Sequence, residues 1–106
     1  MTREGDLRSA LAALLGAREV EVAMLRAYAD ALATHYATES EGLRANADLL
    51  VGGTYDHSRD RRLTVRGVRD RIHAREHQLA WEASVNTTRE ARDAYDEAVA
   101  ALSEEA

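Results

Sequence analysis

The chain has 106 residues, a net charge of −5, and neither cysteine nor proline. One domain accommodates this length, and the lack of cysteine excludes disulfides, cysteine-ligated zinc and thiol catalysis. No apolar run reaches the roughly 18 residues that a membrane span needs, and the charged stretch 2–6 is not followed by an apolar signal segment. We therefore expect no signal peptide or membrane segment, and a location in the cytoplasm or in a larger particle.

The apolar content indicates a helical protein with a thin core. Alanine accounts for 21 residues, whereas Leu, Ile, Val and Phe together account for only 20 of the 106. Alanine has the highest helix propensity but buries little apolar surface. Because a small domain with few large apolar side chains is hard to stabilise alone, we expect a partner, and a second copy of the chain is the simplest one.

Apolar residues spaced alternately by four and three predict a first helix from about Leu7 to Val51. These apolar residues form a stripe along the helix that comprises Leu11, Leu15, Val22, Leu25, Ala29, Leu32, Tyr36, Leu43 and Leu50. Three further positions with the same spacing are polar: Arg18, Glu39 and Asn46. This spacing is typical of a coiled-coil seam.

Local signals refine this first helix. Thr2 and Asp6 are both candidate N-caps. Gly16 and Gly42 lie inside the predicted helix, where glycine is unfavourable, so either marks a close helix approach or a local break, with Gly42 the better candidate for a kink.

A turn is predicted at about 52–63, followed by a second helix over about 64–103 with Thr64 as its N-cap. Gly52-Gly53-Thr54 lacks the Gly-Lys-Ser/Thr ending of a phosphate loop and is expected to end the first helix. The second stripe changes phase after Leu79. Its members are Val65, Val68, Ile72, Arg75 and Leu79, then Trp81, Val85, Thr88, Arg92, Tyr95, Val99 and Leu102.

The two helices are expected to form a long antiparallel, coiled-coil-like hairpin, an all-α fold that builds a helical bundle by oligomerisation. If Val51 lies beside Thr64, the numbers of facing residues add to roughly 115, which predicts the ion pairs Arg18–Glu97, Glu39–Arg75 and Glu21–Arg92. The middle of this seam lacks large apolar partners. We therefore predict a partner interface at Leu25, Ala29, Leu32, Trp81 and Val85.

Charge is distributed unevenly along the chain. Residues 52–75 carry seven arginines and three acidic residues, whereas residues 76–106 carry two arginines and eight acidic residues. The predicted turn and the start of the second helix therefore form a basic tip, composed of Arg59, Arg61, Arg62, Arg66 and Arg69. Such a tip can neutralise nucleic-acid phosphates, pair with an acidic protein surface, or be a solvated face.

His73-Ala74-Arg75-Glu76-His77 resembles the His-x-x-Glu-His motif of inverted zinc metallopeptidases. Two histidines four residues apart share one helix face, as two zinc ligands require. Those enzymes need a distant third ligand, and only 29 residues follow His77. We therefore expect His73 and His77 to be solvated or interfacial histidines, and a non-catalytic metal site at these two residues is the alternative. We predict no catalytic residue and no cofactor.

The chain also resembles the WXG100 class of small secreted helical hairpins in its length, its acidity, its lack of cysteine and its central glycine turn. Val51-Gly52-Gly53 stands where that class has Trp-x-Gly, and Val99 stands four residues after Tyr95, where its export signal has an acidic residue. The resemblance implies export by a type VII system.

These observations favour a non-enzymatic structural or assembly protein that acts as an oligomeric helical hairpin. Components of bacterial or phage particles exemplify the class. The alternatives are a WXG100-like secreted protein and a nucleic-acid-binding module that uses the basic tip.

Overall fold

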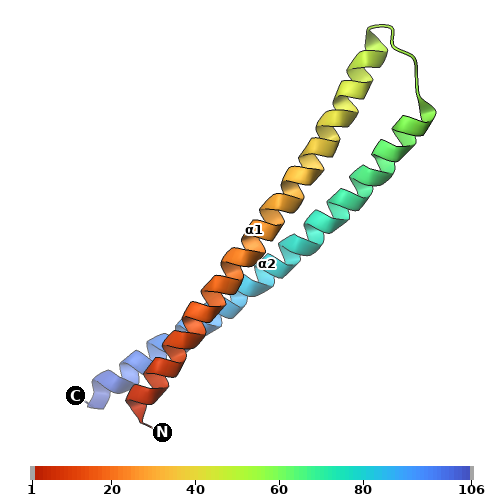
Figure 1. The fold of residues 1–106 in the computed structure, drawn as a ribbon. Coiled ribbons are helices and arrows are strands. Elements are labelled where there is room, and N and C mark those ends of the chain that lie inside the picture. Colours follow the sequence, from red (N-terminus) through yellow and green to blue (C-terminus); the bar gives the residue numbers. More distant parts are fainter. Residues whose placement is uncertain (1, 106) are drawn as a thin grey trace. The chain divides into compact units, whose positions relative to one another are not determined.

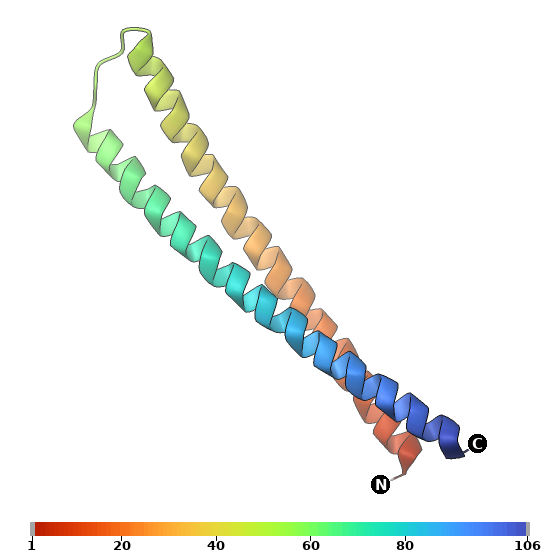
Figure 2. The ribbon, with the colours of Figure 1, turned by 180° about the vertical axis from the view of Figure 1, so that it is seen from behind.

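The computed structural model describes residues 2–105 and contains two helices, α1 (Arg3–Leu50) and α2 (His57–Glu105), joined by a turn at residues 51–56 (Figure 1). The predicted all-α hairpin is confirmed: the helices pack antiparallel against each other (Figure 2), and the described residues contain no strand. The contacts between residues within the chain divide it into two compact units. Unit 1 combines Met1–Leu25 with Leu79–Ala106, and unit 2 comprises Arg26–Gln78.

In unit 1, the first part of α1 lies beside the last part of α2 (Figures 1 and 2). The Arg3 guanidinium donates a hydrogen bond of 2.6 Å to the Ala101 carbonyl oxygen. Thr2 caps α1, because its hydroxyl accepts a hydrogen bond from the Gly5 amide at 3.0 Å. Of the two N-caps suggested by the sequence, the structure uses Thr2.

In unit 2, the last part of α1, the turn and the first part of α2 form a hairpin. The Thr38 hydroxyl donates a 2.6 Å hydrogen bond to the Asp70 carboxylate, and Arg66 forms an ion pair with Glu41. Both contacts join α1 to α2. They fix the register of unit 2, in which the numbers of facing residues add to about 108.

The end of α1 is closed by two glycines, as the sequence predicts. The Gly53 amide bonds the Asp48 carbonyl at 2.8 Å and the Gly52 amide bonds the Leu49 carbonyl at 3.3 Å, which is the Schellman arrangement. Gly52 has φ of +94°, a conformation that favours glycine. A Cβ atom on Gly53 would lie 2.6 Å from the Asp48 carbonyl oxygen, so neither position accommodates a side chain without strain.

The start of α2 corrects the predicted boundary. α2 begins at His57, seven residues before Thr64, and the turn is therefore shorter than expected. The physical reason is Asp56, whose carboxylate accepts the Arg59 amide at 3.0 Å and so caps the helix. Thr64 instead lies inside α2, where its hydroxyl bonds the Asp60 carbonyl at 3.0 Å.

This earlier start shifts the register by about seven residues from the predicted one. The predicted Glu39–Arg75 ion pair is wrong: Glu39 pairs with His35 at 3.0 Å and Arg75 bonds Gln78 at 3.0 Å, both on their own helices. A shift of seven residues preserves the heptad phase. The spacing of apolar residues therefore could not distinguish the two registers.

On both helices, the less exposed positions are separated alternately by three and four residues. On α1, most of these positions lie one residue before a position of the predicted stripe. On α1 they include Leu7, Ala10, Leu14, Ala17, Glu21 and Met24 in unit 1, and Tyr28, Ala31, His35, Thr38, Gly42, Ala45 and Leu49 in unit 2. On α2 they include Leu63, Gly67, Asp70, Ala74 and His77 in unit 2, and Trp81, Ser84, Thr88, Ala91, Tyr95, Ala98 and Leu102 in unit 1. The spacing of α2 continues across Leu79 and Trp81, so the predicted phase change is absent.

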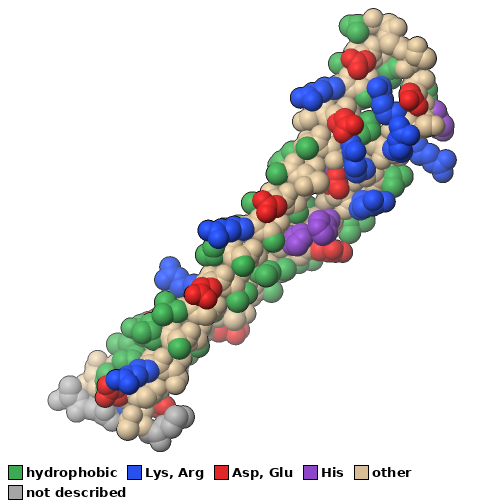
Figure 3. All heavy atoms as spheres, viewed as in Figure 1, with side chains coloured by type: hydrophobic (Ala, Val, Ile, Leu, Met, Phe, Trp, Pro, Cys, Tyr) green, Lys and Arg blue, Asp and Glu red, His purple; other side chains and the backbone are tan. Residues whose placement is uncertain are grey.

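These inner positions are occupied largely by small and polar side chains. The buried residues among those described are Leu14, Ala31, Thr38, Ala74, Ser84 and Thr88. Most large aliphatic residues of the predicted stripe on α1 are instead exposed, from 41% for Leu11 to 88% for Leu50, whereas Leu32 is half-buried. Small side chains let the helices approach closely, and the larger side chains remain on outer faces, as the exposed hydrophobic atoms in Figure 3 illustrate.

Both helices continue through the positions at which a break was considered. α1 includes Gly16 and Gly42 without interruption, and a Cβ atom at either would meet nothing within 4 Å. α2 likewise runs without a break from its first residue to its last. Within the described residues, neither helix combines the length and the apolarity that crossing a bilayer requires.

Candidate functional site

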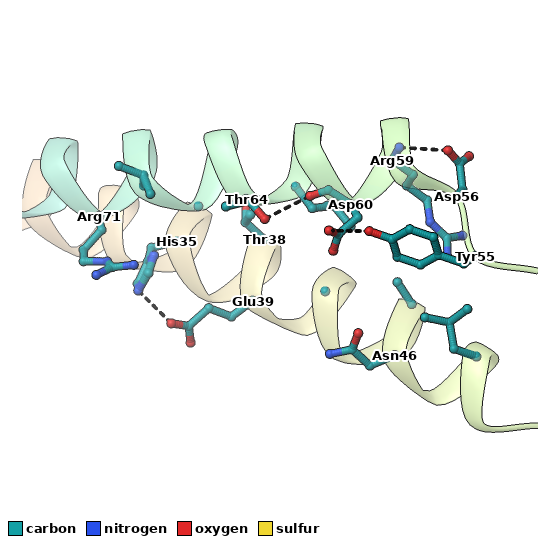
Figure 4. Close-up of a pocket in the computed structure, with 16 residues that line it drawn as sticks. His35, Thr38, Glu39, Asn46, Tyr55, Asp56, Arg59, Asp60, Thr64 and Arg71 are labelled. Carbon is teal, nitrogen blue, oxygen red and sulfur yellow. Dashed lines mark hydrogen bonds and ion pairs between the residues drawn. The ribbon is translucent and has the colours of Figure 1, made fainter.

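A groove of about 300 Å³ lies within unit 2, between α1, the turn and α2 (Figure 4). Its polar lining comes from all three elements. The labelled side chains are His35, Thr38, Glu39 and Asn46 from α1, Tyr55 and Asp56 from the turn, and Arg59, Asp60, Thr64 and Arg71 from α2. The sequence pattern did not identify this groove, because it depends on the register of the two helices.

His35 is a largely enclosed ionisable side chain of this groove. Its side chain is 14% exposed, and its Nε2 atom lies 3.0 Å from the Glu39 carboxylate (Figure 4). Its Nδ1 atom is buried and has no hydrogen-bond partner. One ring nitrogen is thus held by an acidic neighbour on α1, while the other faces the packed interior of unit 2.

The turn side of the groove is organised by two aspartates. The Tyr55 hydroxyl donates a hydrogen bond of 3.1 Å to Asp60, which, with smaller contributions from desolvation and the aspartate charges, raises the pKa of the tyrosine. The Arg59 amide bonds the Asp56 carboxylate and lowers the pKa of that carboxyl group (Figure 4). These contacts join the turn to the first residues of α2. Their clearest role is to hold the start of that helix.

The predicted basic tip lies on α2 of unit 2, not in the turn. All five of its members (Arg59, Arg61, Arg62, Arg66 and Arg69) line a second groove, together with Glu41, Ser58, Leu63 and Val65. Figure 3 shows basic side chains gathered around this end of α2. The ion pair with Glu41 neutralises the charge of Arg66. The structure adds the groove that these five arginines line.

The predicted partner interface is distributed over both units. Leu25 on α1 is 45% exposed in unit 1. Trp81 and Val85 on α2 are half-buried in the same unit. Ala29 is exposed and Leu32 half-buried on α1 of unit 2. Leu25 is therefore the large side chain of this set that is most available to a partner.

His73 and His77 lie together on α2 in unit 2. Their Nε2 atoms are 3.2 Å apart, and the two rings meet edge to face with centroids separated by 4.5 Å. The His73 side chain is largely exposed, and the exposed Glu76 carboxylate lies 4.0 Å from its Nδ1 atom. The described residues include no group of three or more metal-ligating side chains.

No family model, no curated protein and no solved structure matches the chain.

Proposed function

We propose that the chain is a non-enzymatic structural or assembly protein that acts as an oligomer of helical hairpins. The observation that carries this proposal is the outer face of α1 in unit 1. Leu11, Leu15, Val22 and Leu25 are between 41% and 53% exposed there, although each has an apolar side chain of core size. Their spacing of four, seven and three residues places them on one side of the helix.

Burial of these side chains would contribute substantial stability. Complete burial of a leucine or valine side chain contributes about 1.5–3 kcal/mol, and these four are already about half covered. A partner that covers the remainder therefore adds on the order of 3–6 kcal/mol. By contrast, the buried apolar residues of the described chain are Leu14 and two alanines, so the internal core is small.

A second copy of the chain is the partner that we infer, and charge supports this choice. Unit 1 carries five arginines and eleven acidic residues, for a net charge of −6, whereas unit 2 carries nine arginines and eight acidic residues, for +1. Placing unit 1 of one copy against unit 2 of another brings unlike charges together. Complementary potentials of this kind guide association and fix its register.

The test compares Leu25→Glu with Ala23→Glu in light scattering. Both residues are exposed on α1 in unit 1, and both variants add one carboxylate. We expect Leu25→Glu to lower the mass to that of one chain, because it places a charge in the apolar interface. Ala23→Glu serves as the matched control and is expected to keep the assembled mass. Equal masses for both variants would show that Leu25 does not lie in the interface.

A second candidate function, nucleic-acid binding, is favoured by the groove that the basic tip lines. Arginine side chains are suited to phosphate contacts. Among the described residues of unit 2, no ion pair joins Arg61, Arg62 or Arg69 to an acidic side chain. The test is binding of the full chain to duplex DNA and to single-stranded RNA at several salt concentrations. Affinity that falls steeply with salt, and falls further in Arg62→Gln, would support it. Salt-independent or undetectable binding would refute it.

Export by a type VII system stays the third alternative. The hairpin is the feature shared with the WXG100 class, while Val51, at the start of the turn, takes the place of the tryptophan in the motif of that class. The decisive measurement is secretion of the chain by cells with and without a functional type VII apparatus. Release into the medium that depends on the apparatus would replace the assembly proposal as the principal one.

A further inference from the structure

We propose that His73 and His77 chelate a divalent transition-metal ion, for which Zn²⁺ is the natural probe. The two imidazoles come from successive turns of α2, because residues four apart lie on one face of a helix. Their Nε2 atoms approach to 3.2 Å. This site is independent of the apolar face of unit 1, since both histidines belong to unit 2.

The separation of the two nitrogen atoms matches the geometry of a zinc chelate. Zinc binds histidine nitrogen at about 2.0–2.1 Å and is usually tetrahedral, so two nitrogen ligands of one ion lie about 3.3–3.4 Å apart. The observed 3.2 Å is within reach of that value through small side-chain rotations. Without the metal, the two Nε2 atoms lie at hydrogen-bonding distance from each other. The ion would be bound between two nitrogen atoms that already lie close together.

The surroundings of the pair are compatible with a cation. The Glu76 carboxylate lies 4.0 Å from Nδ1 of His73, the ring nitrogen that faces away from His77. This distance is too long for a hydrogen bond, so Glu76 contributes a negative charge near the site that favours a bound cation. Arg75, the nearest arginine in the sequence, bonds Gln78 at 3.0 Å and is thereby held to its own helix.

The site would be open on its outer side. The His73 side chain is 64% exposed and Glu76 is 71% exposed, while His77 is half-buried. The chain contributes two ligands, and within the described residues no third histidine or carboxylate completes the set. Water occupies the remaining coordination positions of the isolated protein, and a group from another molecule can displace it. Imidazole ligands favour Zn²⁺, Cu²⁺ and Ni²⁺ over Mg²⁺ or Ca²⁺.

The test is calorimetric titration of the full chain with ZnCl₂ in a buffer that does not chelate metals. We expect saturable binding of no more than one ion per chain at this site. His73→Ala and His77→Ala should each lower the affinity at least tenfold, because loss of a ligand exceeds the roughly 10–100-fold effect of losing an outer-sphere partner. The matched control is His57→Ala, which removes an exposed histidine at the start of α2 and should leave the affinity unchanged.

A second measurement keeps the proposal testable if a variant is misfolded. Far-ultraviolet circular dichroism reports whether each variant keeps its helices, and alanine favours a helix more than histidine does. In the unmodified chain, zinc should shift the imidazole proton resonances of His73 and His77 and leave those of His57 in place. Absence of zinc binding, binding unaffected by both alanine variants, or shifts confined to other histidines would overturn the proposal.

Discussion

Thr38 on α1 donates a hydrogen bond of 2.6 Å to the Asp70 carboxylate on α2, inside unit 2. Thr38 is buried and Asp70 is half-buried, so this contact is a polar element among small side chains. A hydrogen bond to a charged group contributes about 1.5–3 kcal/mol, and an unsatisfied partner left behind is costly. This pair therefore fixes the register of the hairpin as well as stabilising it.

Thr38→Val tests that role, because valine keeps the shape of threonine and removes the hydroxyl. We expect the free energy of unfolding to fall by about 1.5–3 kcal/mol, since the Asp70 carboxylate loses its donor. The measurement is urea unfolding followed by circular dichroism. Thr34→Val is the matched control, as the Thr34 hydroxyl is exposed and bonds only the Asp30 carbonyl of its own helix. An equal effect for both variants would show that the Asp70 contact contributes nothing specific.

The interior glycines of α1 should be sites of stabilisation. Gly16→Ala and Gly42→Ala are each expected to raise the free energy of unfolding by about 0.5–1 kcal/mol, because alanine loses less backbone entropy in a helix. A Cβ atom at either position meets no other atom within 4 Å. The opposite sign is expected for Gly52→Ala and Gly53→Ala at the end of α1, where the backbone conformation and the Asp48 carbonyl exclude a side chain.

Thermal unfolding of the four alanine variants checks this contrast. Stabilisation by the two interior changes and destabilisation by the two terminal ones is the expected pattern. If Gly42→Ala destabilised the protein, the space beside Gly42 would be occupied by a partner, and the change would then also alter the assembled mass.

Asp56 should make the stability of the hairpin depend on pH. Its carboxylate accepts the Arg59 amide, which lowers the pKa of Asp56 below the ordinary value of 3.8. A group whose pKa is lower in the folded state stabilises that state above its unfolded pKa, and this contribution is lost as the pH falls through the folded pKa. We therefore expect the melting temperature to decrease below about pH 4 partly through this residue.

Asp56→Asn separates the titration from the cap itself. Asparagine is an N-cap of similar quality but has no ionisable group, so the variant should melt near the unmodified protein at neutral pH and lose less stability on acidification. Melting curves at several pH values between 2.5 and 7 provide the measurement. Identical pH profiles for the two proteins would show that other carboxyl groups account for the acid dependence.

The sequence predicted the helical hairpin because its local signals agree: alanine-rich periodic segments flank a pair of glycines. The end of α1 was predicted correctly at Gly52, where the backbone requirement is specific to glycine. The start of α2 was not, although Asp56 is a capping residue type and Asp60 supplies an acidic residue to the first turn. The cluster of arginines that follows obscured this signal, and Thr64 offered a competing cap.

The inner face of the helices could not be predicted from apolar periodicity. That approach assigns the largest side chains to the core, whereas the structure buries Ala31, Thr38 and Ala74 and exposes residues such as Leu43 and Ile72. On α1, the predicted apolar stripe and the observed inner face are one residue apart. Only the contact between the helices determines which of the two lies against the other helix. The two histidines on which the proposed zinc site rests, by contrast, are visible in the sequence as His73 and His77, four residues apart.

The mass of the unmodified chain in solution tests the central proposal most directly. Multi-angle light scattering after size exclusion, at loading concentrations over a hundredfold range, gives the number of chains per particle. We expect at least two chains of 11.7 kDa in a particle that stays assembled on dilution to micromolar concentration. A fully helical particle of one chain at every concentration would contradict it, because the apolar face of α1 would then be stable in water without a second copy.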